Sequence, residues 1–574
     1  MTGSKRPRTI EWQRAFADDL QRVAREQPAA VTIIERRAVG ADGNLRILVS
    51  LPTEELASAE GGLTFQAQER FSIVIPPLPF VPPGVEVDHR RFAGFPHVLA
   101  GLRLCIYLDP SSEWDPRGGA AALLERLWSW LGEAAAGAFD AQTALYHAVG
   151  GVAQPVAGTT TVVVREELRE HHAMAYAHER SPRRIDLAAD DSAGGLALPI
   201  WYSPDSLPYG VSSDLRDLAQ LLDDPNLLRG GSPELGSAPK LDGLVTTLKA
   251  AADRNPEHTD QMFMIAVAHP RGGSPHLLAG ALDGTVADSL REKDVGQLLA
   301  ATMPMPIVWH RVSDERTSVT TRRDATRPVR RLAGSSVFLW GCGGLGSWIA
   351  EFVVRAGVSR IVLCDPGTVT GGLLVRQDFE ELDVGEEKAV ALAARLRRIR
   401  DDVAVEVEDG YNPDDLEHVA ANFDLIIDAT ANMAVSRAVS SIAGLRRATV
   451  AQVATDRENG NLGIATIWPA NATKTIEQID AEVGERVRAD SALEGYHMLW
   501  GRADLGNKLV PTRGCSIPTF HGSAADLAAV AGSLLSLVAG HMDTLVAGVH
   551  LIALPHSGLA VPPHRFFEVE PATA

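Results

Sequence analysis

The chain has 574 residues, enough for two to four domains, and its 45% hydrophobic and 22% charged content is that of an ordinary globular protein. A formal net charge of −19 argues against a general binder of nucleic acids or anionic membranes, because both ligands are themselves negative. The N-terminus lacks the apolar segment of a secretory signal and no stretch is long enough for a membrane span, so we expect a cytoplasmic protein that binds neither nucleic acid nor membrane.

Residues 1–150 have the pattern of an α+β domain. A helix-like segment, EWQRAFADDLQRVAREQ, is followed by the strand-like runs VTIIERRAV and LRILVSLP, with the turn signal GADGN between them. A further strand, FSIVIPPLPFVPPG, ends in a proline-rich turn. LRLCIYLD is a short apolar strand that carries Cys105, and ALLERLWSWLGEAAAGAF is an amphipathic helix. We therefore expect antiparallel strands packed against helices in this domain.

Residues 151–330 carry fewer signals. VTTLKAAADR has the pattern of a helix, and QMFMIAVAHP and MPIVWHRV have the pattern of strands. Loop-like stretches such as RGGSPELGSAPKLDG separate them. No motif with a chemical role stands out, and we interpret this region as an α/β linker domain.

Residues 331–574 contain a glycine-rich turn between an apolar strand and a helix. Gly341-Cys342-Gly343-Gly344-Leu345-Gly346 is a G-x-G-x-x-G run, which in this context indicates a phosphate cradle. Asp365 follows Gly341 by 24 positions at the end of the next strand, where a carboxylate can accept hydrogen bonds from a ribose. Strands and helices continue to alternate downstream, which predicts a mostly parallel, doubly wound, Rossmann-like sheet.

These features fit NAD and ATP equally well. Arg376 in LLVRQDF and Lys388 in GEEKAV lie just beyond Asp365. Fixed cations there suit a triphosphate, whose charge must be neutralised as pyrophosphate leaves. Each cation alone is more simply a surface residue, but the two together in this order favour ATP.

Over about residues 330–530 the chain resembles the ThiF, MoeB and ubiquitin-activating adenylyltransferases. The stretches that carry this resemblance are GCGGLGS, LCDPG, VRQDF, DVGEEKA and DLIIDATAN. The resemblance implies that ATP and Mg²⁺ are bound, that a protein's C-terminal carboxylate is adenylated, that Arg376 takes part in the chemistry and that the protein is a homodimer. It also implies the ATP-binding residues, which are Gly341, Gly343, Gly344, Gly346, Asp365, Arg376 and Lys388.

The chain departs from this family's pattern at two places. Leu373-Leu374-Val375 stands where the family has an asparagine before the arginine, and Ala431-Asn432 stands where it has Asp-Asn, whose aspartate helps to hold magnesium. Asp428 is the nearest carboxylate that could replace it as the metal ligand, and a cap at the end of a strand is the alternative role. The paired zinc-binding cysteines of many relatives are absent, so we predict no zinc.

Cys515 lies in TRGCSIPTFHGSAAD, between Gly514 and Pro518 and just before a predicted helix start. Such a position lowers the pKa of a thiol. A buried small residue is the alternative interpretation. The resemblance favours an activating cysteine that takes the acyl group from AMP as a thioester.

Cys105 lies in FPHVLAGLRLCIYLDPSSEWDP, which looks like the active-site stretch of ubiquitin-conjugating enzymes. The matching features are Pro96-His97 before the cysteine and Trp114-Asp115-Pro116 after it. The usual oxyanion-supporting asparagine is not identifiable. His97 is either its substitute or a structural residue. The resemblance implies that Cys105 receives the acyl group.

The chain carries both resemblances, one after the other. This arrangement is similar to the bacterial fusions of a conjugating and an activating enzyme in antiphage operons, such as the CD-NTase-associated ligase-like proteins of CBASS. This implies a thioester relay from Cys515 to Cys105, followed by attack of an amine. The partner would be a cGAS-like nucleotidyltransferase or, in another pathway, a ubiquitin-like protein. Two other interpretations remain open: a sulfur-carrier adenylyltransferase with an N-terminal docking module, and a nucleotide-binding scaffold without turnover.

Overall fold

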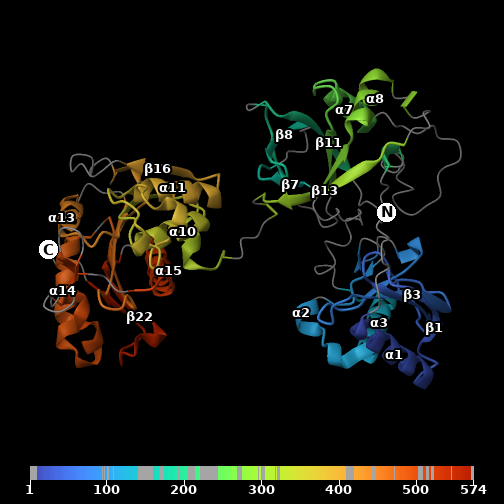
Figure 1. The fold of residues 1–574 in the computed structure, drawn as a ribbon, viewed down its shortest axis with the longest axis horizontal. Coiled ribbons are helices and arrows are strands. Elements are labelled where there is room, and N and C mark those ends of the chain that lie inside the picture. Colours follow the sequence, from blue (N-terminus) through green and yellow to red (C-terminus); the bar gives the residue numbers. More distant parts are fainter. Residues whose placement is uncertain are drawn as a thin grey trace. The chain divides into compact units, whose positions relative to one another are not determined.

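The protein is described by a computed structural model in which the chain divides into two compact units, Met1–Thr321 and Arg322–Ala574 (Figure 1). The described residues are 10–92, 95, 97–99, 103–107, 109–139, 160–167, 174–191, 194–203, 214–216, 218–219, 244–267, 274–294, 297–298, 304–316, 318–319, 324–408, 419, 421–442, 448–470, 472–501, 509–511, 516–518, 522–544 and 546–569. Among these residues, no helix combines the length and the apolar character needed to cross a membrane.

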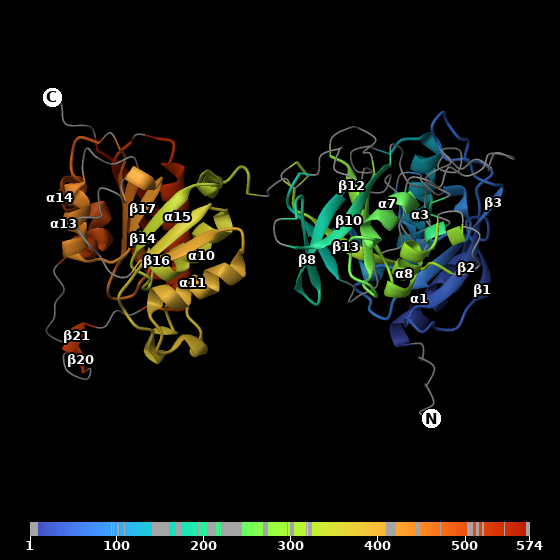
Figure 2. The same cartoon turned by 90° about the horizontal axis from the view of Figure 1, so that it is seen from above.

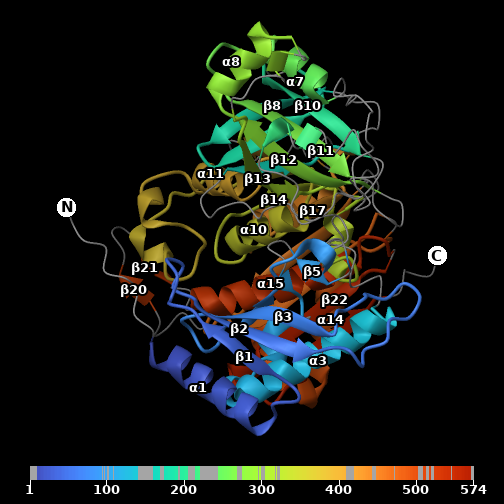
Figure 3. The same cartoon turned by 90° about the vertical axis from the view of Figure 1, so that its right-hand side faces the viewer.

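The first unit begins with a six-stranded antiparallel sheet in the order β1-β2-β3-β4-β6-β5. Inward residues alternate along β2, so that Leu45, Ile47, Val49 and Leu51 are buried while their neighbours are not. Helices α1 and α3 pack against this face of the sheet, and their buried residues and those of the strands form one core (Figure 3). The strands are β1 Thr32–Arg36, β2 Leu45–Pro52, β3 Gln68–Ile75, β4 Gly84–Glu86, β5 Val98–Leu99 and β6 Arg103–Leu104; the helices are α1 Glu11–Glu26, α2 Pro110–Glu113 and α3 Gly119–Ala136. The α+β organisation predicted for this region is confirmed.

The rest of the first unit contains a closed seven-stranded barrel in the order β10-β11-β12-β13-β7-β9-β8. Its interior is apolar, and a second core forms where α7 and α8 cover β11 (Figure 1). The elements are β7 Thr161–Val164, β8 Met174–Ser181, β9 Arg184–Ala188, β10 Leu196–Ser203, α7 Leu244–Ala252, β11 Gln261–Val267, β12 His276–Leu282, α8 Gly284–Glu292 and β13 Ile307–Asp314. Helix α7 and strands β11 and β13 lie where the sequence predicts them, but closure into a barrel could not be inferred from it.

The second unit is built on an eight-stranded sheet in the order β16-β15-β14-β17-β18-β19-β22-β23. The strands from β16 to β18 are parallel, and β19, β22 and β23 continue the sheet antiparallel. They are β14 Ser336–Trp340, β15 Arg360–Cys364, β16 Ala404–Glu408, β17 Leu425–Asp428, β18 Thr449–Thr455, β19 Leu462–Trp468, β22 Gly548–Ala553 and β23 His564–Glu568. The mostly parallel, Rossmann-like sheet is confirmed.

Helices cover both faces of this sheet, as the doubly wound prediction requires (Figure 2). Helices α10 Gly346–Ala356, α11 Lys388–Ile399 and α15 Ala524–Gly540 pack on one face, and α13 Met433–Ser441 and α14 Ile476–Ala489 pack on the other. The order of strands reverses at β14, since β15 lies on one side of it and β17 on the other. In open α/β sheets, ligands bind beyond the carboxyl ends of the strands at this point.

Candidate functional site

The glycine turn leaves β14 at that reversal and closes tightly on itself. Gly341 has φ of 88°, a left-handed conformation that favours glycine, and its amide donates to the Cys364 carbonyl at 2.8 Å. A Cβ atom at Gly346 would lie only 1.7 Å from the Gly341 carbonyl oxygen. The turn therefore excludes side chains at both ends, and Gly346 begins α10 directly behind it.

The N-terminus of α10 lies under the turn. The Gly343 carbonyl accepts hydrogen bonds from the Ser347 amide at 3.0 Å and from the Ser347 hydroxyl at 2.7 Å. A Cβ atom at Gly343 would meet nothing within 4 Å, so no packing against the protein requires a glycine there. Open space at this position, next to a helix N-terminus, suits the close approach of an anion such as a phosphate.

Asp365 follows β15 and holds the turn with its carboxylate. One oxygen accepts a hydrogen bond from the Cys342 amide and the other from the Gly367 amide, both at 2.7 Å. Each carboxylate oxygen has a second lone pair, so hydroxyl groups of a ribose could still donate to it. The structure thus brings Asp365 to the glycine turn, as the predicted nucleotide site requires.

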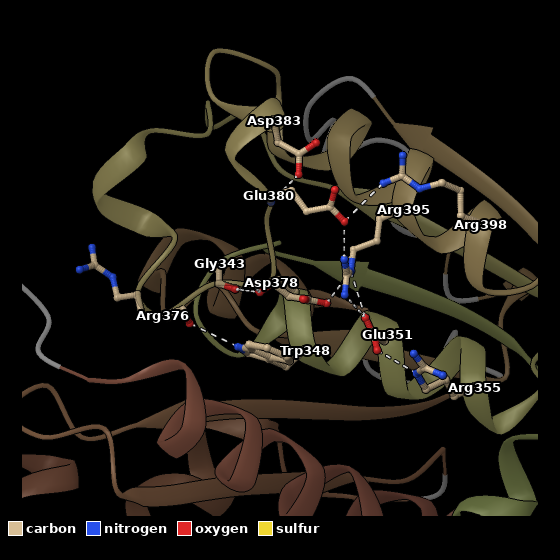
Figure 4. Close-up of polar contacts among 11 residues, drawn as sticks. Gly343, Trp348, Glu351, Arg355, Arg376, Asp378, Glu380, Asp383, Arg395 and Arg398 are labelled. Carbon is tan, nitrogen blue, oxygen red and sulfur yellow. Dashed lines mark hydrogen bonds and ion pairs between the residues drawn. The ribbon is translucent and has the colours of Figure 1, made fainter. Parts of the chain in front are cut away.

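The two predicted cations come from the segments that follow. Lys388 is the first residue of α11, its amide donates to the Gly367 carbonyl at 2.8 Å, and its charge acts on Cys342 inside the glycine turn. The carbonyl of Arg376 accepts a hydrogen bond from the Trp348 indole at 3.3 Å, and Figure 4 shows its guanidinium directed away from the acidic cluster beside it. Lys388 therefore lies close to the glycine turn, and Arg376 is anchored by its backbone to α10.

Asp428 ends β17 beside the turn, directly across from Trp340 of β14. One of its oxygens accepts hydrogen bonds from the Thr430 amide at 3.0 Å and hydroxyl at 2.6 Å, and the other accepts from the Gln452 side chain at 2.9 Å. Asp428 thus caps its strand end in this structure. The magnesium role stays a prediction, and the described residues contain no group of three or more acidic, histidine or cysteine side chains arranged to hold a metal.

The position that differs from the family pattern has an unusual backbone. Ala431 has φ of 50°, a left-handed conformation that costs a residue with a Cβ atom free energy. The next residue, Asn432, accepts a hydrogen bond from the Ala434 amide at 2.8 Å and so caps the start of α13. The turn is therefore well defined, although it presents a methyl group where the family has a carboxylate.

The cysteines of this unit that the structure describes are buried. Burial raises the pKa of the Cys342 thiol far above its usual range and that of Cys364 to about 11, with nearby acidic groups adding to both shifts. Neither thiol is poised as a nucleophile. Cys515 lies outside the described residues, which resume at β21 Ser516–Pro518 and again at Gly522, just before Ser523, the N-cap of α15.

In the first unit, Cys105 follows β6 immediately and is half-buried, and the predicted strand ends one residue before it. Its amide donates to the His97 carbonyl at 2.8 Å, and its thiol donates to the Tyr107 carbonyl at 3.4 Å. Burial raises the pKa of this thiol; the Arg103 charge opposes the shift and the Glu113 charge adds to it. The thiol is accessible but is largely protonated at neutral pH.

The residues that flank Cys105 hold its surroundings in place. His97 has φ of 60° and a buried ring that packs on Phe139 with centroids 4.7 Å apart. The Trp114 indole donates to the Pro79 carbonyl at 2.8 Å, which fastens the segment after the cysteine to the proline-rich turn. The structure therefore joins His97 to Cys105 through a backbone hydrogen bond, packs the His97 ring on Phe139 and fixes Trp114 to the proline-rich turn.

The sequence did not single out the residues that support the nucleotide turn. Ser347, Glu351, Asp378 and Arg395 form one polar cluster behind Arg376 (Figure 4). Asp378 belongs to the same VRQDF stretch as Arg376, and this proximity in sequence is the one signal that could have identified a member of the cluster. Its ion pair with Arg395 depends on the packing of α11 beside α10, and a local pattern does not reveal it.

Two family models match this chain in separate regions. Residues 16–163 match the prokaryotic E2 family A, and residues 319–551 match the ThiF family. The first region contains Cys105. The second contains the glycine turn, Asp365, Arg376, Lys388 and Asp428, together with Cys515.

Curated relatives match parts of the chain. The chain is 30% identical over 175 residues to tRNA threonylcarbamoyladenosine dehydratase of Escherichia coli, covering 30% of this chain and 65% of that protein. It is 36% identical over 104 residues to the SAMP-activating enzyme E1 of Haloferax volcanii, covering 18% and 38%. It is 44% identical over 70 residues to the mouse adenylyltransferase and sulfurtransferase MOCS3, covering 12% and 15%. The chain thus spans less than two thirds of each relative.

Solved structures are similar to the chain only distantly. PaaA is 19% identical with a TM-score of 0.31, covering 42% of this chain and 66% of that one. The microcin C7 biosynthetic enzyme MccB, solved with N-formylated MccA, is 14% identical with a TM-score of 0.29 and the same coverage.

Proposed function

From the premise that this chain joins a prokaryotic E2 family A domain to a ThiF family domain, we propose that it activates the C-terminal carboxylate of a partner protein and conjugates it to an amine. The observation that carries the proposal is the glycine turn at the reversal of strand order, with Asp365 bonded to it and Lys388 beside it. Relatives named as an E1 and as an adenylyltransferase match parts of the chain, which supports ATP as the nucleotide.

In the first half of the reaction, the glycine turn and Asp365 bind ATP, and the charges of Arg376 and Lys388 offset those of its phosphates. A carboxylate oxygen of the partner attacks the α-phosphorus, and pyrophosphate leaves. The product is an acyl-adenylate. Magnesium, when bound, neutralises phosphate charge, and Asp428 is the proposed ligand from this chain.

In the second half, the Cys515 thiolate attacks the acyl carbon and AMP leaves, which forms a thioester. The Cys105 thiolate then attacks that thioester, and the Cys515 thiolate is released. An amine, most simply a lysine, attacks the acyl carbon of the Cys105 thioester, the Cys105 thiolate leaves, and loss of a proton from the amine gives an amide. The half-buried Cys105, bonded through its amide to His97, supports this last role, as does its place in the region that matches the E2 family.

We further propose that the partner is a cGAS-like nucleotidyltransferase in CBASS antiphage defence, with a ubiquitin-like protein as the alternative. The proposed setting is the cytoplasm and the proposed assembly a homodimer. These parts rest on the joining of the two domain types in one chain. They can be tested by offering each partner to the same purified protein.

The test is a thioester trap. The full-length protein is incubated with Mg-ATP and each partner, and intact mass is measured with and without reductant. We expect an acyl adduct on Cys105 that the reductant removes in the native protein and that is absent from Cys515→Ala. Cys105→Ser would carry a reductant-resistant ester instead. Cys364→Ser is the matched control, because that thiol is buried in the same unit and has no proposed role.

An adduct on Cys105 that persists in Cys515→Ala would overturn the relay. Adenylate formation without any adduct would favour a second function, a sulfur-carrier adenylyltransferase with the N-terminal domain as a docking module. The observation behind that alternative is that relatives named as adenylyltransferase and sulfurtransferase match 23% and 12% of the chain. ATP binding without release of pyrophosphate would leave a nucleotide-binding scaffold.

A further inference from the structure

The backbone on both sides of Arg376 is fixed by side chains and amides from two helices. The Trp348 indole of α10 donates to the Arg376 carbonyl at 3.3 Å, and the Asp378 amide donates to the Ser347 hydroxyl at 3.1 Å. The amide of Ala524, the first residue of α15, donates to the Val375 carbonyl at 2.8 Å. Three hydrogen bonds thus hold residues 375–378 while the Arg376 side chain projects outward (Figure 4).

The same contacts connect this segment to the glycine turn. The Ser347 hydroxyl accepts from the Asp378 amide and donates to the Gly343 carbonyl at 2.7 Å. Two hydrogen bonds therefore separate Gly343 from Asp378. A displacement of the Asp378 backbone would therefore move the Gly343 carbonyl as well, because the two hydrogen bonds share the Ser347 hydroxyl.

Behind the segment, two carboxyl groups share one arginine. The side chains of Glu351 and Asp378 are 9% and 7% exposed. Arg395 contacts a Glu351 oxygen at 2.9 Å and an Asp378 oxygen at 3.0 Å, and it also reaches Glu380 at 2.9 Å. Arg355 pairs with Glu351 at 2.8 Å, and Arg398 lies 3.8 Å from Glu380. These are the charged groups that face the pair from α10, from α11 and from its own segment.

Two buried carboxylates in contact repel each other unless one of them carries a proton. Burial, followed by the hydrogen bond and charge of Glu351, raises the pKa of Asp378 to about 7. Burial opposes ionisation of Glu351 as well, but the hydrogen bond from Asp378 and the charges of Arg355 and Arg395 hold its pKa below the usual range. Asp378 is therefore the member of the pair that keeps the proton below neutral pH.

We propose that Ser347, Glu351, Asp378 and Arg395 are positioning residues that hold the 375–378 backbone so that Arg376 faces the phosphates of ATP. The inference rests on the proposed nucleotide site and adds to it the residues that set its geometry. The Asp378 and Glu351 carboxyl groups close this clamp, because both bind Arg395. Ionisation of Asp378 adds a second buried negative charge beside Glu351, which opens the clamp and releases Arg376.

The test compares Asp378→Asn with the native full-length protein between pH 6.5 and 8.5. The amide of asparagine can donate to Glu351 at every pH, so the variant keeps the clamp closed. We expect Mg-ATP, titrated by calorimetry, to bind the native protein about fivefold more weakly at pH 8.5 than the variant does, with nearly equal affinities at pH 6.5. Comparison at each pH cancels the titration of ATP itself.

Hydrogen exchange measured without ATP provides a second readout. Peptides that cover residues 374–380 should exchange faster in the native protein than in Asp378→Asn at pH 8.5, and alike at pH 6.5. Glu406→Gln is the matched control, because Glu406 forms a two-bond ion pair with Arg360 in the same unit, away from the clamp. Glu406→Gln should follow the native protein in both measurements.

The two failures can be distinguished. A native protein that does not bind ATP at any pH overturns the proposed function. The positioning role alone is overturned if the native protein binds ATP with the same dependence on pH as Asp378→Asn and if residues 374–380 exchange equally fast in the two proteins.

Discussion

Around the glycine turn, backbone groups are held by other backbone groups and by the Asp365 carboxylate, whereas around Cys105 side chains do most of the holding. The turn is closed by bonds from Gly341 to Cys364 and from Cys342 to Asp365, at 2.8 and 2.7 Å. Strands β5 and β6, which precede Cys105, have only two residues each. The segment after Cys105 is held by side chains, since Glu113 accepts a hydrogen bond from the Asp109 amide and Trp114 donates one to the Pro79 carbonyl. The two ends of the turn, Gly341 and Gly346, should therefore tolerate no added atom, and the thiol segment should tolerate changes that alter only charge.

The largest effect is expected from Gly346→Ala. The added methyl carbon would lie 1.7 Å from the Gly341 carbonyl oxygen, and that oxygen belongs to backbone that cannot rotate away. We expect a loss of about 1–3 kcal/mol in the free energy of unfolding and no measurable ATP binding. Thermal unfolding followed by circular dichroism and titration with Mg-ATP measure the two effects.

Gly343→Ala separates folding from binding at the same turn. Its methyl group would meet no protein atom within 4 Å, so the free energy of unfolding should change by less than about 0.5 kcal/mol. The affinity for ATP should still fall about tenfold, because the methyl group occupies space that a phosphate needs. Unchanged ATP affinity in Gly343→Ala would show that the phosphates lie elsewhere.

The next effect concerns the thiols themselves. In the folded protein, Cys105 should react with iodoacetamide well before Cys342 and Cys364, because it is half-buried and they are buried. Burial also raises the Cys105 thiol pKa, so its rate should rise about tenfold per pH unit from pH 6.5 to 8.5, as the thiolate fraction does. Peptide mapping by mass spectrometry after timed quenching measures each site.

Unfolding in guanidinium chloride provides the control for that experiment, since the three cysteines should then react alike. If Cys342 is modified as fast as Cys105 in the folded protein, the glycine turn opens readily and the proposed contrast between the two regions is wrong.

The sequence predicted the parts of the molecule whose signals are local. The periodicities that define α1, α3 and α11 are contained within single segments, and so is the glycine turn that leads from β14 to α10. The position of Asp365 beside the turn also follows from sequence spacing, because parallel neighbouring strands place their carboxyl ends together.

Features that depend on distant packing could not be predicted in this way. Barrel closure requires β13 to pair with β7, which lies about 150 residues earlier in the chain. The ion pair between Asp378 and Arg395 exists because α11 packs beside α10. The departure at Ala431 was visible as a residue type, but its left-handed backbone was not, since that conformation is unusual for alanine.

The smallest effect is expected from Glu113→Gln near Cys105. Glu113 accepts a hydrogen bond from the Asp109 amide at 3.0 Å and pairs with Arg126 at 2.6 Å, and its charge raises the pKa of the Cys105 thiol. Glutamine keeps an oxygen for the Asp109 amide but removes the charge. The thiol pKa should then fall, and alkylation of Cys105 at pH 7.5 should speed up roughly twofold.

Arg103→Gln should have the opposite effect, because the Arg103 charge lowers the same pKa. The opposed signs matter more than their size, since a structural disturbance of the segment would change both rates in one direction. If both variants accelerate alkylation, loosened packing controls access to Cys105. If the signs are opposed, electrostatics sets the reactivity of a thiol whose segment stays in place, in contrast to a glycine turn where a single methyl group disrupts the site.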